Sequence, residues 1–223
     1  ASSLFMLSSL IFADADGDSF LDVFASGSGI GYGTSWAAWN RRIDHDHLLL
    51  GYSGALDGVA SRPLPGFPRQ MDDMQFMLSP VAADVSGDGL SDIIQGSTAL
   101  VRGFDYLGNT LPGFPLFHGG WQMASSAIGD VDGDGYRDLV AATREGQLFA
   151  WRTEGKADSV VEWAMFGHDP ARTGNYETPL PAQLGPPEEE TEACSVSSLP
   201  GRGGVGVLAL FALLGLGRRH RRL

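Results

Sequence analysis

Carboxylates recur at every second residue in three short stretches of this chain, a spacing suited to binding a divalent metal ion. In the clearest stretch, residues 130–138, aspartates stand at positions 1, 3, 5 and 9 and glycines at positions 4 and 6. Hard divalent cations take several oxygen ligands at about 2.3–2.6 Å, which carboxylates at alternate positions supply. The glycines let the backbone turn around an ion. The carbonyl of position 7 would add a further oxygen.

The end of this stretch differs from an EF-hand. An EF-hand places a bidentate Glu at position 12, whereas Ala141 stands there in this sequence. The residues after position 9 form an apolar, strand-like run without helical periodicity. The sequence therefore predicts a calcium loop that joins two β-strands.

The same pattern occurs at residues 14–22 and 84–92, again followed by apolar residues. A single copy would also fit a solvated Asp- and Gly-rich turn, but three copies at matching positions favour calcium. The second copy carries Ser86 at position 3 and so has one negative charge fewer, which predicts the weakest site. The first copy has Ser19 where the others have glycine, which should strain its turn.

Repetition extends to the elements that must position these loops. A Leu-Pro-Gly-Phe-Pro segment at residues 64–68 recurs at 111–115, and Asp84 and Asp130 are 46 positions apart. A period in the mid-forties with short strands and Gly/Pro turns is typical of a four-stranded propeller blade. Asp14 and Asp84 are 70 positions apart, and the surplus fits an insertion at residues 27–47, an excursion typical of functional or disordered segments.

Two further segments allow a structural and a functional interpretation. Residues 163–176 either close the last blade, which we favour, or form a binding lip with His168 and Arg172 exposed. A tight turn at residues 145–146 should join two strands. We expect most tryptophans in the core, although Trp36 and Trp39 in the insertion could stack on sugar rings. His118 is expected to be a packing residue.

Composition limits the classes of function. The formal charge is −12, and all 27 acidic residues lie at or before Glu192. Such an acidic body should repel nucleic-acid phosphates, which excludes nucleic-acid binding. The single cysteine, Cys194, excludes an intrachain disulfide framework. The sequence shows no amino-terminal signal peptide and opens within a repeat, so we expect the chain to be the carboxy-terminal portion of a longer protein.

The carboxy-terminal part changes character. Residues 177–193 are rich in Pro and Glu, which predicts a disordered, solvated linker. Cys194 and an apolar run follow, and four arginines stand among the last six residues. The uncharged span 203–217 would form a helix of about 22 Å, short for a membrane span of about 20 residues. We expect a temporary stop in the membrane with the repeats outside the cell; the alternative is a buried globular helix.

The loops and their flanking strands resemble the FG-GAP/VCBS repeats of integrin-α-like β-propellers, over residues 1–176. The resemblance implies an all-β fold of about three propeller blades, at about residues 1–69, 70–116 and 117–176, which form the carboxy-terminal part of a larger propeller. It also implies one Ca²⁺ ion in each hairpin loop, bound through positions 1, 3, 5, 7 (carbonyl) and 9. By position these ligands are Asp14, Asp16, Asp18, Phe20 and Asp22; Asp84, Ser86, Asp88, Leu90 and Asp92; and Asp130, Asp132, Asp134, Tyr136 and Asp138.

Residues 194–223 resemble the MYXO-CTERM sorting signal of myxobacteria and their relatives, with a cysteine, a short apolar helix and an arginine cluster in order. This resemblance implies that Cys194 is the processing and anchoring position. The mature protein would then sit on the cell surface, anchored through its tail, or be released.

Together these features predict a non-enzymatic, calcium-stabilised extracellular module for adhesion or for binding an unidentified protein or polysaccharide. The alternative is an accessory or scaffold domain of a larger secreted hydrolase or lyase, whose catalytic residues would lie upstream of Ala1. Residues 44–47, Asp-His-Asp-His, could bind a transition metal or supply an acid/base pair. They lie in the insertion without a third partner that the sequence identifies, so we favour a polar loop tip and expect no catalytic site.

Overall fold

The computed structural model describes residues 2–32, 47–55, 62–71, 74–75 and 78–180. Within these ranges the chain is all-β and contains no helix, which confirms the predicted fold class at this level. The described residues belong to one compact unit, Ala1–Pro187. Most of the predicted linker, Cys194 and the predicted terminal helix lie outside the described residues. In the part of the chain that is described, no helix is long and apolar enough to span a membrane.

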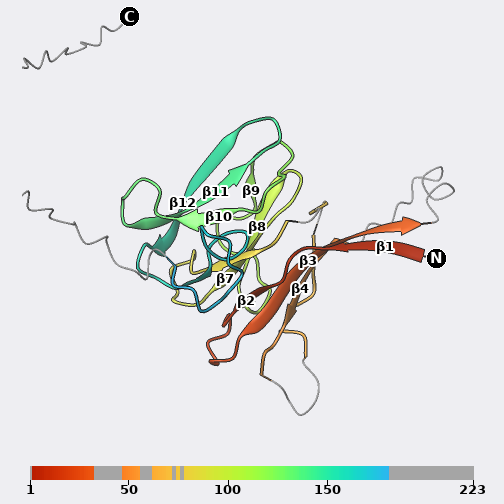
Figure 1. Ribbon diagram of the computed structural model, residues 1–223, viewed down its shortest axis with the longest axis horizontal. Coiled ribbons are helices and arrows are strands. Elements are labelled where there is room, and N and C mark those ends of the chain that lie inside the picture. The colour runs from red at the N-terminus through yellow and green to blue at the C-terminus, as the bar shows by residue number, and fades with distance from the viewer. Residues whose placement is uncertain (1, 33–46, 56–61, 72–73, 76–77, 181–223) are drawn as a thin grey trace, which may run out of the picture. The chain divides into compact units, whose positions relative to one another are not determined.

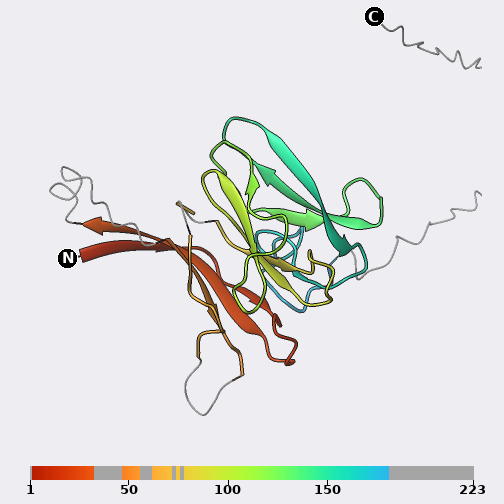
Figure 2. The same ribbon diagram turned by 180° about the vertical axis from the view of Figure 1, so that it is seen from behind.

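The strands form three antiparallel sheets (Figures 1 and 2). The first sheet has the order β1-β3-β4-β5, with β2 paired to β3; its strands are β1 (Ser2–Leu7), β2 (Ile11–Ala13), β3 (Asp22–Tyr32), β4 (His47–Tyr52) and β5 (Arg69–Gln70). The second has the order β13-β6-β7-β8-β9; its strands are β6 (Val81–Ala83), β7 (Asp92–Gly96), β8 (Leu100–Phe104), β9 (Leu116–Phe117) and β13 (Val161–Trp163). The third has the order β10-β11-β12; its strands are β10 (Ala127–Gly129), β11 (Tyr136–Ala142) and β12 (Leu148–Lys156).

One hairpin recurs in all three sheets. A three-residue strand leads through an acidic loop into a longer strand, as β2–β3, β6–β7 and β10–β11. The register of the three hairpins is the same at the loop. The residue before the loop pairs with the last aspartate of the loop, as Ala13 with Asp22, Ala83 with Asp92, and Gly129 with Asp138. The prediction that each acidic loop joins two strands is therefore confirmed.

The second sheet packs between the first and the third and is therefore the middle sheet, buried on both faces. Val81 and Ile94 are cross-strand partners and pack with Ile128 and Leu139 of the third sheet. Their neighbours Ala82 and Ile93 point the other way and pack in the core of the first sheet. Successive side chains of a strand alternate between its faces, so a strand covered on both sides needs apolar residues throughout. This explains the apolar Val-Ala-Ala of β6 and the Ile93-Ile94 pair of β7.

The two Leu-Pro-Gly-Phe-Pro segments adopt the same turn. Leu64 N–H donates to Gly51 O at 3.0 Å, and Leu111 N–H donates to Gly103 O at 3.0 Å. The phenylalanine of each copy packs directly over the glycine that accepts this bond: a Cβ added to Gly51 would lie 2.9 Å from the Phe67 ring. The sequence repeat is therefore also a repeat of packing.

The predicted insertion is partly regular structure. β3 continues to Tyr32, and Gly27–Tyr32 of this strand pairs with β1. Residues 27–32 are therefore strand and not an excursion, because β1 supplies them with a backbone partner. Trp36, Trp39 and residues 44–46 lie outside the described residues.

Residues 163–176, which we expect to close the last blade, share only Trp163 with a strand, β13 (Val161–Trp163), and Ala164 O accepts the N–H of Ile128 in the third sheet. β13 joins the second sheet, where Val161 and Trp163 pair with β6. This pairing satisfies backbone groups of β6 that would otherwise form an open sheet edge. The binding-lip alternative is wrong for His168, which is only 1% exposed, although Arg172 is exposed.

The other packing predictions have mixed outcomes. Of the tryptophans in the described ranges, Trp163 is buried, Trp151 is half-buried and Trp121 is exposed. Among these three described tryptophans, only Trp163 is therefore a core residue. His118 is buried, as expected for a packing residue. The tight turn at Gly146 is confirmed, because its N–H donates to Thr143 O at 3.0 Å between β11 and β12.

Candidate metal centres

The three acidic loops, which we call the first (14–22), second (84–92) and third (130–138) loop, share one internal architecture. In each loop the aspartate at position 9 is buried and accepts a hydrogen bond from the N–H of position 2. The pairs are Ala15 to Asp22 at 3.1 Å, Val85 to Asp92 at 3.0 Å and Val131 to Asp138 at 2.9 Å. This bond ties the end of each loop to its start.

The aspartates at positions 1 and 5 hold the turn between these ends. Position 1 accepts the N–H of position 6, from Ser19 at 2.9 Å, Gly89 at 3.2 Å and Gly135 at 3.1 Å. Position 5 accepts the N–H of position 7, from Phe20 at 2.8 Å, Leu90 at 2.9 Å and Tyr136 at 2.9 Å. The backbone thus winds around the carboxylates instead of spreading them apart.

Left-handed backbone at two positions makes this winding possible. Position 4 is Gly17, Gly87 or Gly133, each with positive φ. At position 6, Gly89 and Gly135 have φ of 90° and 85°, and Ser19 adopts the same region with φ of 70°. An L-residue with a Cβ is disfavoured there by about 1–2 kcal/mol. Ser19 therefore does occupy a strained position, as the sequence predicted.

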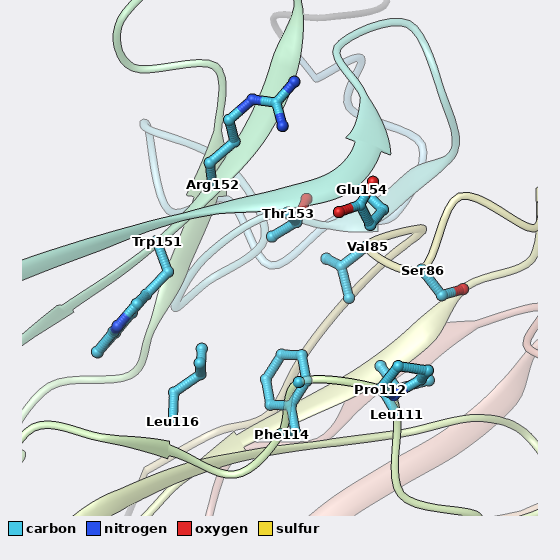
Figure 3. Close-up of a pocket in the computed structure, with 11 residues that line it drawn as sticks. Val85, Ser86, Leu111, Pro112, Phe114, Leu116, Trp151, Arg152, Thr153 and Glu154 are labelled. Carbon is cyan, nitrogen blue, oxygen red and sulfur yellow. The ribbon is translucent and has the colours of Figure 1, made fainter.

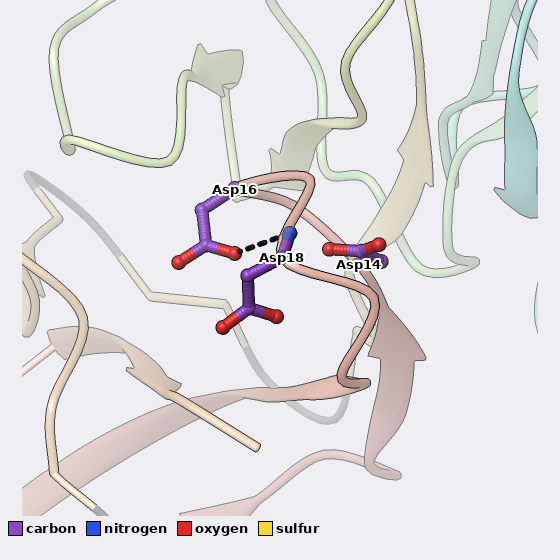
Figure 4. Close-up of side chains that lie close together, drawn as sticks. All are labelled: Asp14, Asp16 and Asp18. Atoms are coloured by element: carbon purple, nitrogen blue, oxygen red, sulfur yellow. Dashed lines mark hydrogen bonds between the residues drawn. The ribbon is translucent and has the colours of Figure 1, made fainter. Parts of the chain in front are cut away.

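Carboxylate oxygens converge in two of the loops. One oxygen from each of Asp14, Asp16 and Asp18 lies within 4.8 Å of the others, and Figure 4 shows these side chains around the first loop. In the third loop, Asp130, Asp132 and Asp138 converge in the same way. Either cluster could hold a metal ion. The clusters of three or more acidic groups in the described ranges do not include one from the second loop.

One ligand oxygen of the first loop has no partner. Asp14 Oδ1 is buried and accepts no hydrogen bond from a described residue. The equivalent oxygens of the other two loops accept the N–H of position 4, from Gly87 at 2.6 Å and Gly133 at 2.7 Å. Leaving a buried carboxylate oxygen unsatisfied is costly, and a cation at the centre of the loop would satisfy it. The residues of the first loop therefore fit a metal ion.

The raised pKa values of three loop aspartates also favour a bound cation. Burial raises the pKa of Asp22 and of Asp92 to about 6. Burial, together with repulsion from Asp18 and Asp14, also raises the pKa of Asp16. Crowded and desolvated carboxylates resist ionisation unless a positive charge lies among them. A divalent cation would supply that charge.

In the third loop, part of this charge comes from the chain itself. Arg152 of β12 hydrogen-bonds to Asp134, and its guanidinium lies 3.6 Å from the centroid of the Tyr136 ring. The bond from Arg152 holds the pKa of Asp134 below its usual range. Asp134 is also the one predicted carboxylate ligand of the third loop that stands outside its cluster. Sequence reasoning missed Arg152, because only the β11–β12 register places it opposite Asp138.

The residues at position 7, Phe20, Leu90 and Tyr136, were predicted to contribute only their carbonyls. Their N–H groups fix each of them beside the position-5 carboxylate. The Phe20 side chain is 57% exposed and takes no part in the core. Because a phenyl ring has no ligand atom, Phe20 can bind an ion only through its backbone carbonyl.

No protein-family model matches this chain, and neither curated proteins nor solved structures contain a significant match to it. Fold and site together define an all-β protein with three repeated acidic hairpin loops, two of which could hold a metal ion.

Proposed function

We propose that this chain is a calcium-stabilised, non-enzymatic module that binds a partner outside the cell. The observation that carries the proposal is the threefold repetition of one hydrogen-bond pattern around alternating carboxylates, at positions 1, 5 and 9 of every loop. A solvated turn would not need a buried aspartate at position 9 of every loop, nor the burial that raises the pKa of Asp22 and of Asp92.

Calcium is the ion that this donor set favours. The three loops offer carboxylate, hydroxyl and carbonyl oxygens and contain neither His nor Cys. Hard oxygen donors suit Ca²⁺ and Mg²⁺, whereas imidazole and thiolate suit zinc and copper. Ca²⁺ tolerates flexible coordination by six to eight oxygens, while Mg²⁺ demands near-ideal octahedral geometry. Loops with five potential ligands each, plus water, suit the larger ion. The second loop, with Ser86 at position 3, would bind it most weakly.

The arrangement of the sheets supports a propeller. Two successive sheets contain four-stranded meanders, β2–β5 and β6–β9, and the middle sheet packs face to face with the sheet on either side. Repeated four-stranded sheets with short connections are the building plan of propeller blades. We assign blades to about residues 1–69, 70–116 and 117–176 of a larger propeller, in which the ions would stiffen one hairpin per blade.

An apolar groove offers a surface for a partner. It has a volume of about 620 Å³, and its apolar lining includes Leu7, Leu78, Met123 and Phe166. Leu7, Leu78 and Met123 precede β2, β6 and β10, so they stand at the ends of these strands opposite the acidic loops. Leu7 and Met123 are each 54% exposed. Loops that ions hold rigid at one end would present a fixed apolar surface at the other.

A second hollow lies between the second and third sheets. It has a volume of about 250 Å³ and includes Phe114, Leu116 and Trp151 (Figure 3). In Figure 3 the Arg152 side chain points away from these apolar groups. It hydrogen-bonds to Asp134 of the third loop instead. The apolar lining suits ring or aliphatic groups of a ligand. Display at the cell surface through Cys194 belongs to the same proposal and rests on the sequence of the tail.

Calcium binding by the full chain tests the proposal. In the presence of Ca²⁺, we expect metal analysis to find about three Ca²⁺ per chain. EDTA should lower the melting temperature, and restoring Ca²⁺ should raise it again. Asp132→Asn should remove most of the binding by the third loop. Glu177→Gln, which removes an exposed negative charge outside the loops, should leave the stoichiometry unchanged. A melting curve that is the same in EDTA and in Ca²⁺ would contradict structural ions.

A further inference from the structure

One short segment contacts all three acidic loops. Residues 159–162 run into β13 beside β6, and Ser159, Val160 and Glu162 each form a hydrogen bond to a residue of an acidic loop. None of these contacts follows from the loop motif itself. They link three candidate ion sites that are far apart in the sequence.

Glu162 joins the first loop to the second. Its Oε1 accepts the N–H of Asp14 at 2.9 Å and the hydroxyl of Tyr176 at 2.7 Å. Its Oε2 accepts the hydroxyl of Ser91. Asp14 is position 1 of the first loop, and Ser91 is position 8 of the second, directly before the buried Asp92. A single half-buried carboxylate thus holds the start of one loop and the end of another.

The neighbouring residues anchor the other loop ends. Val160 O accepts the N–H of Asp84, position 1 of the second loop, at 2.9 Å. In the third loop, the guanidinium of Arg137 at position 8 donates to the backbone carbonyl of Ser159. The third loop is therefore tied to the same segment, but through Ser159 and not through Glu162.

We propose that Glu162 is a positioning residue that couples metal binding by the first loop to metal binding by the second; this inference rests on the proposed function. An ion must draw together ligands from both ends of a loop. When it does so in the first loop, it fixes Asp14 and with it the Glu162 carboxylate. Glu162 then holds Ser91, and so the end of the second loop, in place before an ion arrives there. Binding of the second ion then costs less conformational entropy, and this is positive cooperativity.

The test follows the ion at each loop separately in the full chain. The amides of Ser19, Gly89 and Gly135 are equivalent position-6 reporters whose NMR resonances should shift when their own loop is filled. Calcium titrations compare the wild type, Asp16→Asn, Glu162→Gln and the double variant. We expect Asp16→Asn to raise the calcium midpoint at Gly89 by about fivefold or more, the lower end of typical couplings. In the Glu162→Gln background, Asp16→Asn should change this midpoint by less than about twofold.

Three control measurements test whether the coupling runs through Glu162. Gly135 reports a loop anchored through Ser159, so its midpoint should be nearly the same in all four proteins. Tyr176→Phe removes a hydroxyl from Glu162 without touching a loop and should leave the coupling intact. If Glu162→Gln does not fold, Ser91→Ala removes only the contact to the second loop and should abolish the coupling as well.

The possible failures are distinct. Absence of calcium binding by the wild type would overturn the proposed function and the coupling together. Calcium binding with a Gly89 midpoint that is indifferent to Asp16→Asn would overturn the coupling alone. Coupling that survives both Glu162→Gln and Ser91→Ala would remove Glu162 from the role assigned to it.

Discussion

Arg152 lies across the third acidic loop with its Nε 2.6 Å from Oδ2 of Asp134. The side chain reaches there from β12, and its guanidinium also covers the ring of Tyr136. A positive group of the protein thus already occupies one carboxylate that the loop pattern assigns to an ion. The third loop has the full set of four aspartates but does not offer all of them freely to a cation.

Removing Arg152 should strengthen calcium binding by the third loop. Arg152→Gln deletes a positive charge beside the site and releases Asp134 Oδ2. Since exposed ion pairs contribute about 0.2–1 kcal/mol, we expect an affinity gain of up to about fivefold. The calcium midpoint reported by the Gly135 amide resonance measures this gain in affinity. Arg144→Gln, which removes an arginine that lies over Trp121 instead, should give no gain.

Replacing Ser19 with glycine should stabilise the protein. Ser19 has φ of 70°, whereas its counterparts in the other loops are glycines. Relief of this strain, less the greater flexibility of glycine in the unfolded chain, should raise the free energy of unfolding by about 0.5–1 kcal/mol. A melting temperature higher by about 1–4 °C would follow. Ser9→Gly, at a serine without positive φ, should instead lower the free energy of unfolding. Equal effects of the two substitutions would show that Ser19 is not strained.

The stability of the calcium-free protein should fall as the pH rises from 5 to 7. Burial raises the pKa of Asp22 and of Asp92 to about 6 in the folded state, above the ordinary value of 3.8. A carboxyl with a raised folded pKa binds its proton more tightly in the folded state than in the unfolded state, so ionisation through pH 6 costs stability. The lowered pKa of Asp134 acts in the other direction, but only as the pH falls towards that carboxyl's folded pKa.

Thermal melts in EDTA and in Ca²⁺ at several pH values measure this dependence. The difference between the two melting temperatures should widen from pH 5 to pH 7, because calcium neutralises the carboxylates that are costly to ionise. A melting temperature in EDTA that rises over this interval would show that other groups dominate.

Gly155→Ala should destabilise the contact between β12 and the second loop. A Cβ at Gly155 would lie 2.0 Å from Asp84 O, and Gly155 N–H donates to Val85 O at 3.2 Å. Overpacking of this kind costs about 1–3 kcal/mol, which corresponds to a melting temperature lower by about 2–12 °C. Gly129→Ala, where a Cβ would meet nothing within 4 Å, serves as the control. We expect only the first change to weaken calcium binding reported by Gly89.

The acidic loops and their hairpins were predictable because their information is local. All ligands of a loop lie within nine consecutive residues, and the following apolar run shows that a strand comes next. Arg152 and Glu162 were not predictable, because each reaches its loop only through pairing with another strand. Three-residue strands such as β13 also carry too little periodicity to reveal a partner. Their side-chain contacts depend on a register that appears only in the folded chain.

The same limit explains two strand pairings that the sequence did not reveal. β13 follows the third sheet along the chain, yet it pairs with β6 of the second sheet. Gly27–Tyr32 has no counterpart in the other repeats, and its partner β1 precedes the first loop. In both places the pairing is between segments that no local pattern connects. A repeat pattern assigns a segment by its place in the sequence. In the folded chain, however, a strand can pair with any open edge of a sheet.

The double burial of β6 and β7 has a consequence for how the molecule comes apart. Solvent cannot reach either face of these strands until a neighbouring sheet detaches, and β13 shields the remaining edge of β6. Deuterium should therefore enter the Ile93 and Ile94 amides last, through an opening that separates whole layers. The outer sheets would fray and reclose many times before this central layer is ever exposed.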